Sequence, residues 1–302
     1  MSDVIVCVGP ANLMANHLWN HAALLVAAHD HGVRLVDPAL GPWAAEFERF
    51  VHDPFGGAGL GRWPTGSTSA THRQAVRLGP RAARRLRRAA AAGRLPRWAA
   101  FVESGWHSTL VDPDGVVHVD APEFTGLLDT RRVVLVHGPL FRHADRAAFL
   151  ARRDLVVDAL RPVPAVIGRA ARAADRARRG RPTLIGVHVR RGDYAGYLGG
   201  RYFFDWSVYE RVIAHVADTW GRDRVAFLVT SDETPPTDFA RDLDWSPGPG
   251  DAVGDLTALG HCDLVVGPPS TFSHWASFVG GAPRWLLEHA SDRPHPDGFV
   301  PA

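Results

Sequence analysis

The sequence of 302 residues contains no lysine, so all 34 of its Lys-or-Arg cations are arginines. A Walker-type phosphate loop uses a lysine to reach the β- and γ-phosphates. Its absence speaks against that class of nucleotide enzyme. The formal net charge is only +2, so the chain as a whole is not a polycation of the kind that binds nucleic acid.

Cysteine is also scarce. Cys7 and Cys262 each lie in a short apolar run, and two distant thiols make no disulfide framework. We expect both to be small buried residues in a reducing compartment. The first residues have no basic signal-peptide region, and no apolar run reaches the roughly 18 residues that span a bilayer. The sequence predicts a cytoplasmic protein without a transmembrane segment and leaves contact with a membrane surface open.

The composition is that of an ordinary globular protein, with 46% hydrophobic and 22% charged residues. A strand at 4–8, a helix at 17–32 that Gly32 would end and a strand at 33–36 predict a parallel sheet. Another strand is expected at 133–136, followed by a loop and a helix up to residue 157.

The second half alternates strands with helices more regularly. Strands are expected at 184–189, 225–230 and 264–266, and helices at 205–219, 255–262 and 273–279. Pro162 and Pro164 break the chain, and a polar, arginine-rich bridge follows them. This pattern places a domain boundary near residue 180, with domains 1–180 and 181–302 facing a cleft.

One apolar run ends in an unusual group of charges. Residues 184–189 have the β-branched content of a buried strand, and Arg190, Arg191 and Asp193 follow at once. Ligands of open α/β sheets bind at the carboxyl ends of strands. Two guanidiniums there suggest a site for a multiply charged anion. The alternative is a structural salt-bridge corner.

Several segments together resemble the α-1,2-fucosyltransferase family, within the wider group of α-1,2-, α-1,6- and protein O-fucosyltransferases. The segments are VHVRRGDY (187–194), SDE (231–233), the run from DLTALGHCD to STFSHW (255–275), ANHLWNHA (15–22) and HGPLFRHAD with the helix after it (137–157). The resemblance is strongest over 184–280 and faint over 40–130. The combination of His-x-Arg-Arg-x-Asp with Ser-Thr-Phe-Ser about eighty residues later is its most specific part.

The resemblance implies a GT-B fold of two Rossmann-like domains. It also implies transfer of fucose from GDP-fucose to an acceptor hydroxyl, on a glycan or glycoside, with inversion. The resemblance further implies that neither a metal nor another cofactor is required. The α-1,2 linkage is inherited from the resemblance alone.

The same resemblance assigns roles to residues. Arg190 would bind the β-phosphate, His188 would approach the ribose or base, and Asp255 would accept hydrogen bonds from guanine. Arg190 and Asp193 are the candidate catalytic residues. The candidate donor-binding residues are His188, Arg190, Arg191, Asp232, Asp255, Ser270, Thr271, Phe272, Ser273 and, in the first domain, Asn16.

Several assignments have structural alternatives. Asp255 could cap its helix, and Ser270 to Ser273 could do the same while binding phosphate. Asp193 could tie its loop to the arginines, and Asp232 could hold its loop or touch the sugar. No catalytic base stands out among Asp193, Glu46 and Asp205.

The sequence departs from the family at three positions. Ala15 replaces a glycine, His21 stands where tyrosine is common, and His274 stands where tryptophan is common. These departures keep two rival functions open. One is the same fold with another GDP-sugar, and the other is a GDP-sugar-binding protein without transferase activity.

Weaker patterns are interpreted as structure. His17 and His21 have the helical spacing of zinc ligands but no third ligand, so a surface or cleft-lining pair is favoured. GGAGLG at 56–61 is interpreted as a loop, and Asp112-Pro-Asp114-Gly115 as a turn, although Asp-x-Asp also occurs in metal-dependent sugar transferases. The nine arginines of 73–97 predict a solvated helix face. A nucleic-acid-binding protein is the last alternative.

Overall fold

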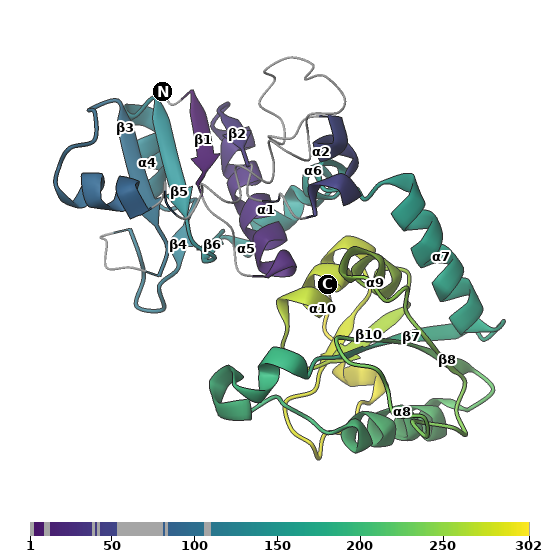
Figure 1. Cartoon of the computed structure of the whole chain (residues 1–302). Helices are drawn as coiled ribbons and strands as arrows, with labels where there is room; N and C mark the ends of the chain where they lie inside the picture. Colours follow the sequence, from purple (N-terminus) through teal and green to yellow (C-terminus); the bar gives the residue numbers. More distant parts are fainter. Residues whose placement is uncertain are drawn as a thin grey trace. The chain divides into compact units, whose positions relative to one another are not determined.

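The computed structural model describes residues 3–8, 13–37, 40, 43–52, 81, 84–105 and 110–301. The chain forms two compact units, Met1–Val163 and Pro164–Ala302 (Figure 1).

The first unit is built on a sheet of four parallel strands, in the order β2-β1-β5-β3. These strands are β1 (Val4–Cys7), β2 (Arg34–Val36), β3 (Ala99–Glu103) and β5 (Val133–His137). A smaller sheet pairs β4 (Val117–His118) with β6 (Phe141–Arg142). The helices are α1 (Met14–Asp30), α2 (Glu48–His52), α4 (Pro122–Thr130), α5 (Arg146–Ala151) and α6 (Arg153–Ala159), with helical residues also at 84–91 and a 3-10 turn at Ala44–Glu46.

The long helix α1 is buried along nearly its whole length, because small and apolar side chains follow one another without a charged residue before Asp30. It packs on β1 and β2 and on the small strand β6. Gly32, with a φ of +63°, takes up the left-handed conformation just past the end of the helix. The helix therefore lies where the sequence predicts it, but it begins three residues earlier, at Met14.

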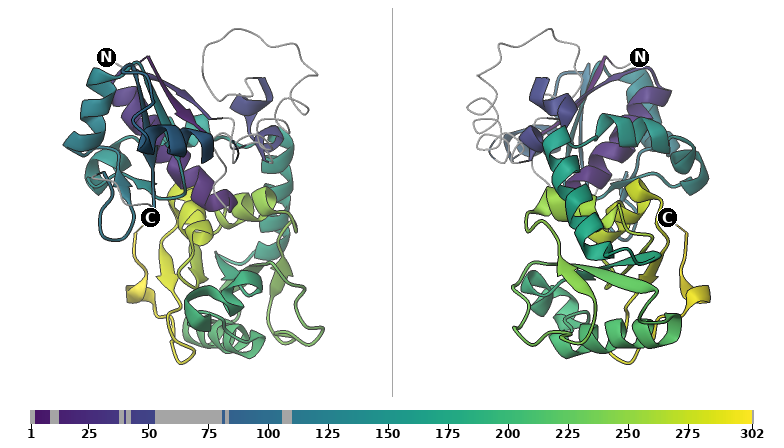
Figure 2. Two further views of the ribbon diagram at one scale, coloured as in Figure 1. Left: turned by 60° about the vertical axis from the view of Figure 1, so that its left-hand side comes forward. Right: turned by 90° about the vertical axis from the view of Figure 1, so that its right-hand side faces the viewer.

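The second unit has a sheet of five parallel strands, in the order β11-β10-β7-β8-β9. The strands are β7 (Thr183–Val189), β8 (Val225–Ser231), β9 (Trp245–Pro247), β10 (Leu264–Gly267) and β11 (Arg284–Leu286). The helices are α7 (Pro164–Arg178), α8 (Trp206–Trp220), α9 (Ala252–Leu259) and α10 (Thr271–Gly280), with 3-10 turns at Gly192–Ala195, Tyr197–Gly200 and Pro296–Gly298. Helix α8 lies on one side of the sheet, and α9 and α10 lie on the other (Figure 2).

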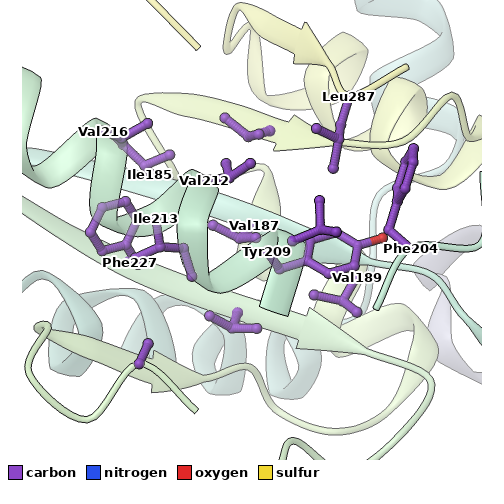
Figure 3. Close-up of a cluster of buried hydrophobic side chains, with 14 of the residues drawn as sticks. Ile185, Val187, Val189, Phe204, Tyr209, Val212, Ile213, Val216, Phe227 and Leu287 are labelled. Atoms are coloured by element: carbon purple, nitrogen blue, oxygen red, sulfur yellow. The ribbon is translucent and has the colours of Figure 1, made fainter. Parts of the chain in front are cut away.

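Strand β7 is buried on both faces, which explains its continuous apolar sequence. Ile185, Val187 and Val189 pack with the buried side of α8 (Figure 3). Leu184 points to the opposite face, into a cluster with the alanines of α7. The site described below is therefore supported by a strand that is held from both sides.

Most of the elements expected in the second half are confirmed, with two corrections. Helix α9 begins at Ala252, so Asp255 lies one turn inside it and the N-cap is Asp251. The segment interpreted as a polar bridge is the helix α7, which buries Val166, Ala170, Ala173 and Ala177. Its apolar face consists mostly of alanine between arginines, so the composition hid the helical periodicity.

Helix α7 also explains why the unit boundary differs from the expected one. Its contacts are with α9 and the second sheet, so it belongs to the second unit and the division falls at Val163. The sequence interpretation places the division near residue 180, at the other end of this helix. The single helix expected up to residue 157 is likewise divided, into α5 and α6, and the loop expected before it contains β6.

Other expectations concern the surface and the thiols. Cys7 and Cys262 are free and buried, as expected. Within the described part of 73–97, Arg81, Arg84 and Arg88 are exposed, in agreement with a solvated face. The GGAGLG segment lies outside the described residues. Among the described helices, none is long and apolar enough to cross a membrane.

We expect Phe227→Ala to lower the free energy of unfolding of the second unit by about 3–5 kcal/mol, because it leaves a cavity in a close-packed core. The Phe227 side chain is 1% exposed. Urea denaturation measures the change, with Val300→Ala as the control because Val300 is 47% exposed. Equal effects of the two substitutions would contradict the described packing.

Candidate functional site

Three neighbouring strands of the second unit, β10, β7 and β8, end at the same edge of the sheet. Their register aligns Val189 with Ser231 and Val187 with Val266. The segments that leave this edge begin at Arg190, Asp232 and Pro268. The sequence motifs that precede and follow these strand ends are thereby brought together, although they are up to eighty residues apart in the chain.

Arg190 is the cation nearest the end of β7. Its Nη2 lies 2.7 Å from Asp193 Oδ1 and its Nη1 lies 3.3 Å from Asp232 Oδ2. The guanidinium also lies 5.9 Å from the centroid of the Tyr194 ring. The Arg190 side chain is 23% exposed, whereas Asp193 is 47% exposed. An anion can therefore reach Arg190 and take the place of the exposed Asp193 carboxylate.

Arg191 has a different role from its neighbour. Its Nε donates to Glu233 at 2.8 Å, and its Nη1 donates to the carbonyl oxygen of Phe204 at 2.6 Å. The guanidinium covers the ring of Phe203 at 4.4 Å. Its backbone N–H donates to Asp232 Oδ1 at 3.0 Å. Arg191 thus ties together the loops after β7 and β8, as a structural salt-bridge corner would.

Gly192 makes the close approach of Asp232 feasible. A Cβ at this position would lie 2.8 Å from Asp232 Oδ2, closer than real side chains pack. The glycine therefore lets one carboxylate contact both Arg190 and the backbone of Arg191. The interpretation of Asp232 as a residue that holds the loop agrees with these contacts.

His188 is a buried and neutral imidazole next to the arginines. It is 4% exposed, and its ring stacks on Phe272 with centroids 4.9 Å apart. Burial, together with the neighbouring Arg190 cation, lowers the pKa of His188 to about 3. Its Nδ1 lies 3.5 Å from Thr230 Oγ1, and its Nε2 has no hydrogen-bond partner among the described residues. An unpartnered buried nitrogen is available for a ligand.

Asp255 projects from α9 near the end of β8. Its Oδ1 accepts a 2.8 Å hydrogen bond from the N–H of Gly250, and a Cβ on Gly248 would meet both this oxygen and Thr230. Burial raises the pKa of Asp255 to about 6, even though the Gly250 N–H favours the ionised form, and the Asp251 carboxylate adds to the increase. The alternative that Asp255 is an N-cap is wrong, because Asp251 caps the helix.

The Ser-Thr-Phe-Ser motif starts α10. Ser270 is the N-cap and accepts a 3.2 Å bond from the N–H of Phe272, and Ser273 Oγ donates back to the Ser270 carbonyl at 3.2 Å. Thr271 is the first helical residue. Tyr194, which sequence reasoning did not single out, donates from its hydroxyl to Pro269 O at 2.6 Å. It joins the loop of Arg190 to the start of this helix.

Other candidates lie elsewhere. Asn16 and Glu46 belong to the first unit, in α1 and in the 3-10 turn before α2. Asp205 is the N-cap residue of α8; its carboxylate is 80% exposed and lies 3.4 Å from Arg191 Nη1. None of these three residues is among those that the second unit gathers around Arg190 and His188.

The interpretation of His17 and His21 as a surface or cleft-lining pair is wrong. They are 3% and 0% exposed, and both bind the buried Asp37, at 3.0 Å through His17 Nε2 and 2.7 Å through His21 Nδ1. Within the described ranges, no group of three or more His, Cys, Asp or Glu could hold a metal ion. The pair links α1 to the end of β2 instead.

The Asp112-Pro-Asp114-Gly115 segment is a turn, as expected. Asp112 Oδ1 accepts from the N–H groups of Asp114 and Val116, and Gly115 has a φ of +82°. A cavity of about 390 Å³ in the second unit lies at the opposite end of β8, beside Val225. It contains none of the predicted site residues.

Comparison with known proteins gives matches at the level of structure. No family model and no curated protein matches the sequence. A mutant of Arabidopsis thaliana FUT1 in complex with GDP superimposes with a TM-score of 0.57 and 13% identity, over 100% of this chain and 74% of that one. Fucosyltransferase NodZ from Bradyrhizobium gives 0.54 and 14%, over 95% of this chain and 96% of that one.

A further structure, NodZ alpha-1,6-fucosyltransferase soaked with GDP-fucose, gives a TM-score of 0.54 with 16% identity, over 100% of this chain and 99% of that one. At such identities the likeness shows the fold. The chain has the predicted GT-B fold of two Rossmann-like units.

The pKa of Asp255 gives a pH dependence that can be tested with Asp255→Asn. Because the pKa in the folded protein, about 6, lies above the usual value, the buried charge costs stability above pH 6 and this cost disappears as the pH falls toward 4. We expect the variant to be more stable than the wild type at pH 8, by on the order of 2 kcal/mol, and equal to it near pH 4.

Urea denaturation from pH 4 to pH 8 measures this difference. His188 is present in both proteins, so its own titration cancels in the comparison. Asp238→Asn is the control, because Asp238 is an exposed carboxylate of the same unit. A gain that does not vary with pH would show that burial of the Asp255 charge is not its cause.

Proposed function

We propose that the protein is a glycosyltransferase that moves fucose from GDP-fucose to an acceptor hydroxyl, with inversion and without a metal. The observation that carries the proposal is the group at the strand ends of the second unit. An accessible arginine, Arg190, lies beside a neutral buried histidine, His188, whose Nε2 has no partner among the described residues. The GT-B fold and the GDP and GDP-fucose complexes of its structural neighbours support the proposal.

Arg190 suits the chemistry of the departing nucleotide. In the reaction, the acceptor oxygen forms a bond to the anomeric carbon while the bond from that carbon to the β-phosphate oxygen breaks. GDP leaves with an additional negative charge, and the acceptor proton passes to a base or to solvent. A planar guanidinium can stabilise the developing phosphate charge with two parallel hydrogen bonds. The N-terminus of α10, at Ser270 to Ser273, would add N–H groups on the same side.

The remaining residues suit recognition of the nucleoside. The unpartnered Nε2 of His188 can bind a ribose or base atom. The Asp255 carboxylate has an oxygen, Oδ2, with no hydrogen bond from the described residues, and it can accept from guanine N–H groups. Phe272 keeps the imidazole in its orientation by stacking. Asp193, paired with Arg190, acts in this proposal as a positioning residue.

The finer parts of the proposal rest on the sequence resemblance. They are the fucose donor, the inverting course, the α-1,2 linkage, the carbohydrate acceptor and the contribution of Asn16 from the first unit. The same fold with another GDP-sugar is the nearest alternative, and a GDP-sugar-binding protein without transferase activity is the next.

We expect Arg190→Ala to abolish transfer and to weaken GDP binding by about 10- to 100-fold, because a charge-assisted hydrogen bond to phosphate contributes about 1.5–3 kcal/mol. Calorimetric titration and an assay of GDP release measure the two effects. Arg211→Ala is the matched control, since Arg211 is an exposed arginine on α8. Near-normal turnover of Arg190→Ala would disprove the assignment.

Treatment with a chelator tests whether the transfer reaction needs a metal ion. We expect the transfer rate to be unchanged within about twofold in excess EDTA, because guanidinium and N–H groups replace a metal at the phosphates. The assay is the same release of GDP, with added Mn²⁺ as the comparison. A strict requirement for Mn²⁺ would contradict the proposal and direct attention back to Asp112 and Asp114.

A further inference from the structure

Arg142 of the first unit is a partly buried cation without a carboxylate partner in the described part of the chain. It lies on β6, just after the segment that leaves the carboxyl end of β5. Burial lowers the pKa of its guanidinium, and no described carboxylate offsets this effect. An uncompensated charge inside a protein is costly, so its presence calls for a reason.

Only one nitrogen of this guanidinium is used. Nη1 donates to Asn20 Oδ1 at 3.0 Å, to the Phe141 carbonyl at 2.7 Å and to the Pro139 carbonyl at 3.4 Å. All three acceptors are neutral. Nε and Nη2 make no hydrogen bond to any described residue. These two nitrogens form the edge of the guanidinium that binds carboxylates and phosphates through two parallel bonds.

Three more exposed arginines of the first unit show the opposite pattern. Arg132 pairs with Asp3, Arg152 with Asp30 and Arg161 with Asp158. These arginines are 45–74% exposed, and exposed pairs contribute little to stability. These three exposed arginines thus have carboxylate partners that add little to stability. The less exposed Arg142 has no carboxylate partner among the described residues.

Two carboxylates of neighbouring segments are bound to histidines. His118, which is in register with Arg142 on the paired strand β4, holds Asp112 at 3.0 Å. His143, the next residue along the chain, holds Asp120 at 3.0 Å. The free edge of Arg142 is thus left for a group from outside the chain.

The segment that carries Arg142 is held in one conformation. Asn20, which is 4% exposed, donates to the Gly138 carbonyl at 3.0 Å and accepts from the Phe141 N–H at 3.1 Å. Ser104 Oγ accepts from the Leu140 N–H at 2.9 Å.

Gly138 has a φ of +103°, and a Cβ there would collide with Ser104, 2.9 Å from its carbonyl oxygen. Only glycine suits this position. The arginine is therefore preorganised rather than free to swing into solvent.

We propose that the Nε–Nη2 edge of Arg142 binds an anionic oxygen group of a substrate. The chemistry fits a carboxylate, a sulfate or a phosphate. The group would come from an acidic acceptor. The anion site itself rests on the geometry of the first unit, whereas its assignment to an acceptor rests on the proposed transferase function.

The experiment measures binding of inorganic phosphate and of glucuronate, as a sugar carboxylate, to wild-type protein, Arg142→Gln and the control Arg132→Gln. Titrations are made by calorimetry or by ligand NMR, in the Arg190→Ala background so that the arginine site of the second unit does not contribute. GDP is titrated separately into the proteins that keep Arg190. Arg132→Gln removes a surface arginine that is 74% exposed.

We expect Arg142→Gln to weaken binding of phosphate or glucuronate tenfold or more and to leave GDP affinity unchanged, while Arg132→Gln leaves all three affinities unchanged. A loss of glucuronate binding assigns the site to a sugar carboxylate, and a loss confined to phosphate assigns it to a phosphorylated acceptor. Unchanged binding of phosphate and glucuronate in Arg142→Gln would overturn the proposal.

Arg142→Lys is the second variant, should Arg142→Gln not fold. Lysine keeps the positive charge and can donate hydrogen bonds from its single nitrogen. It lacks the planar edge of two neighbouring nitrogens that arginine provides. We expect its affinity for the same anion to fall several-fold. Wild-type affinity in a folded Arg142→Lys protein would also overturn the proposal, because it would show that the planar edge is not used. If GDP fails to bind even the wild type, the donor proposal fails while the phosphate and glucuronate titrations still test Arg142.

Discussion

Because β10, β7 and β8 are parallel and adjacent, whatever follows their last residues must meet at one edge of the sheet. This pairing is the constraint on which the proposed donor site depends. It brings Arg190, Asp232 and the start of α10 together from three separate parts of the sequence. The strand in the middle, β7, is packed on both faces, so its end is a fixed point from which the charged side chains project.

The two adjacent arginines show how one local sequence supplies both structure and function. Arg191 uses its guanidinium and backbone on four groups of the same unit and so fixes the loops. Arg190 pairs with two carboxylates, one of which is half exposed and can be displaced. Arg142 in the first unit is a third case, in which the chain supplies only neutral acceptors. A protein without lysine assigns each of these tasks to arginine, whose planar fork permits them.

Much of this could be predicted from sequence, for physical reasons that also explain the failures. Strands such as 184–189 and 225–230 were predicted well because both faces are buried and the apolar run is continuous. The sequence pattern does not predict the helix α7, because alanine and arginine dominate it. For the same reason the expected boundary near residue 180 differs from the observed one at Val163. The site residues on the second unit are brought together as the motifs suggested. Asp255, however, is a buried helical residue rather than a cap. His17 and His21 are buried against Asp37, which lies 16 to 20 residues away, so local sequence patterns do not reveal this contact.

Calorimetric titration of the wild-type protein with GDP, with UDP and ADP as comparisons, tests the proposed donor site without any knowledge of the acceptor. We expect GDP to bind and UDP and ADP to bind at least tenfold more weakly, since Asp255 and His188 recognise the base and ribose. Failure of all three nucleotides to bind would contradict the donor site at the ends of β7, β8 and β10. Arg190 would then be, like Arg191, a structural part of the loop.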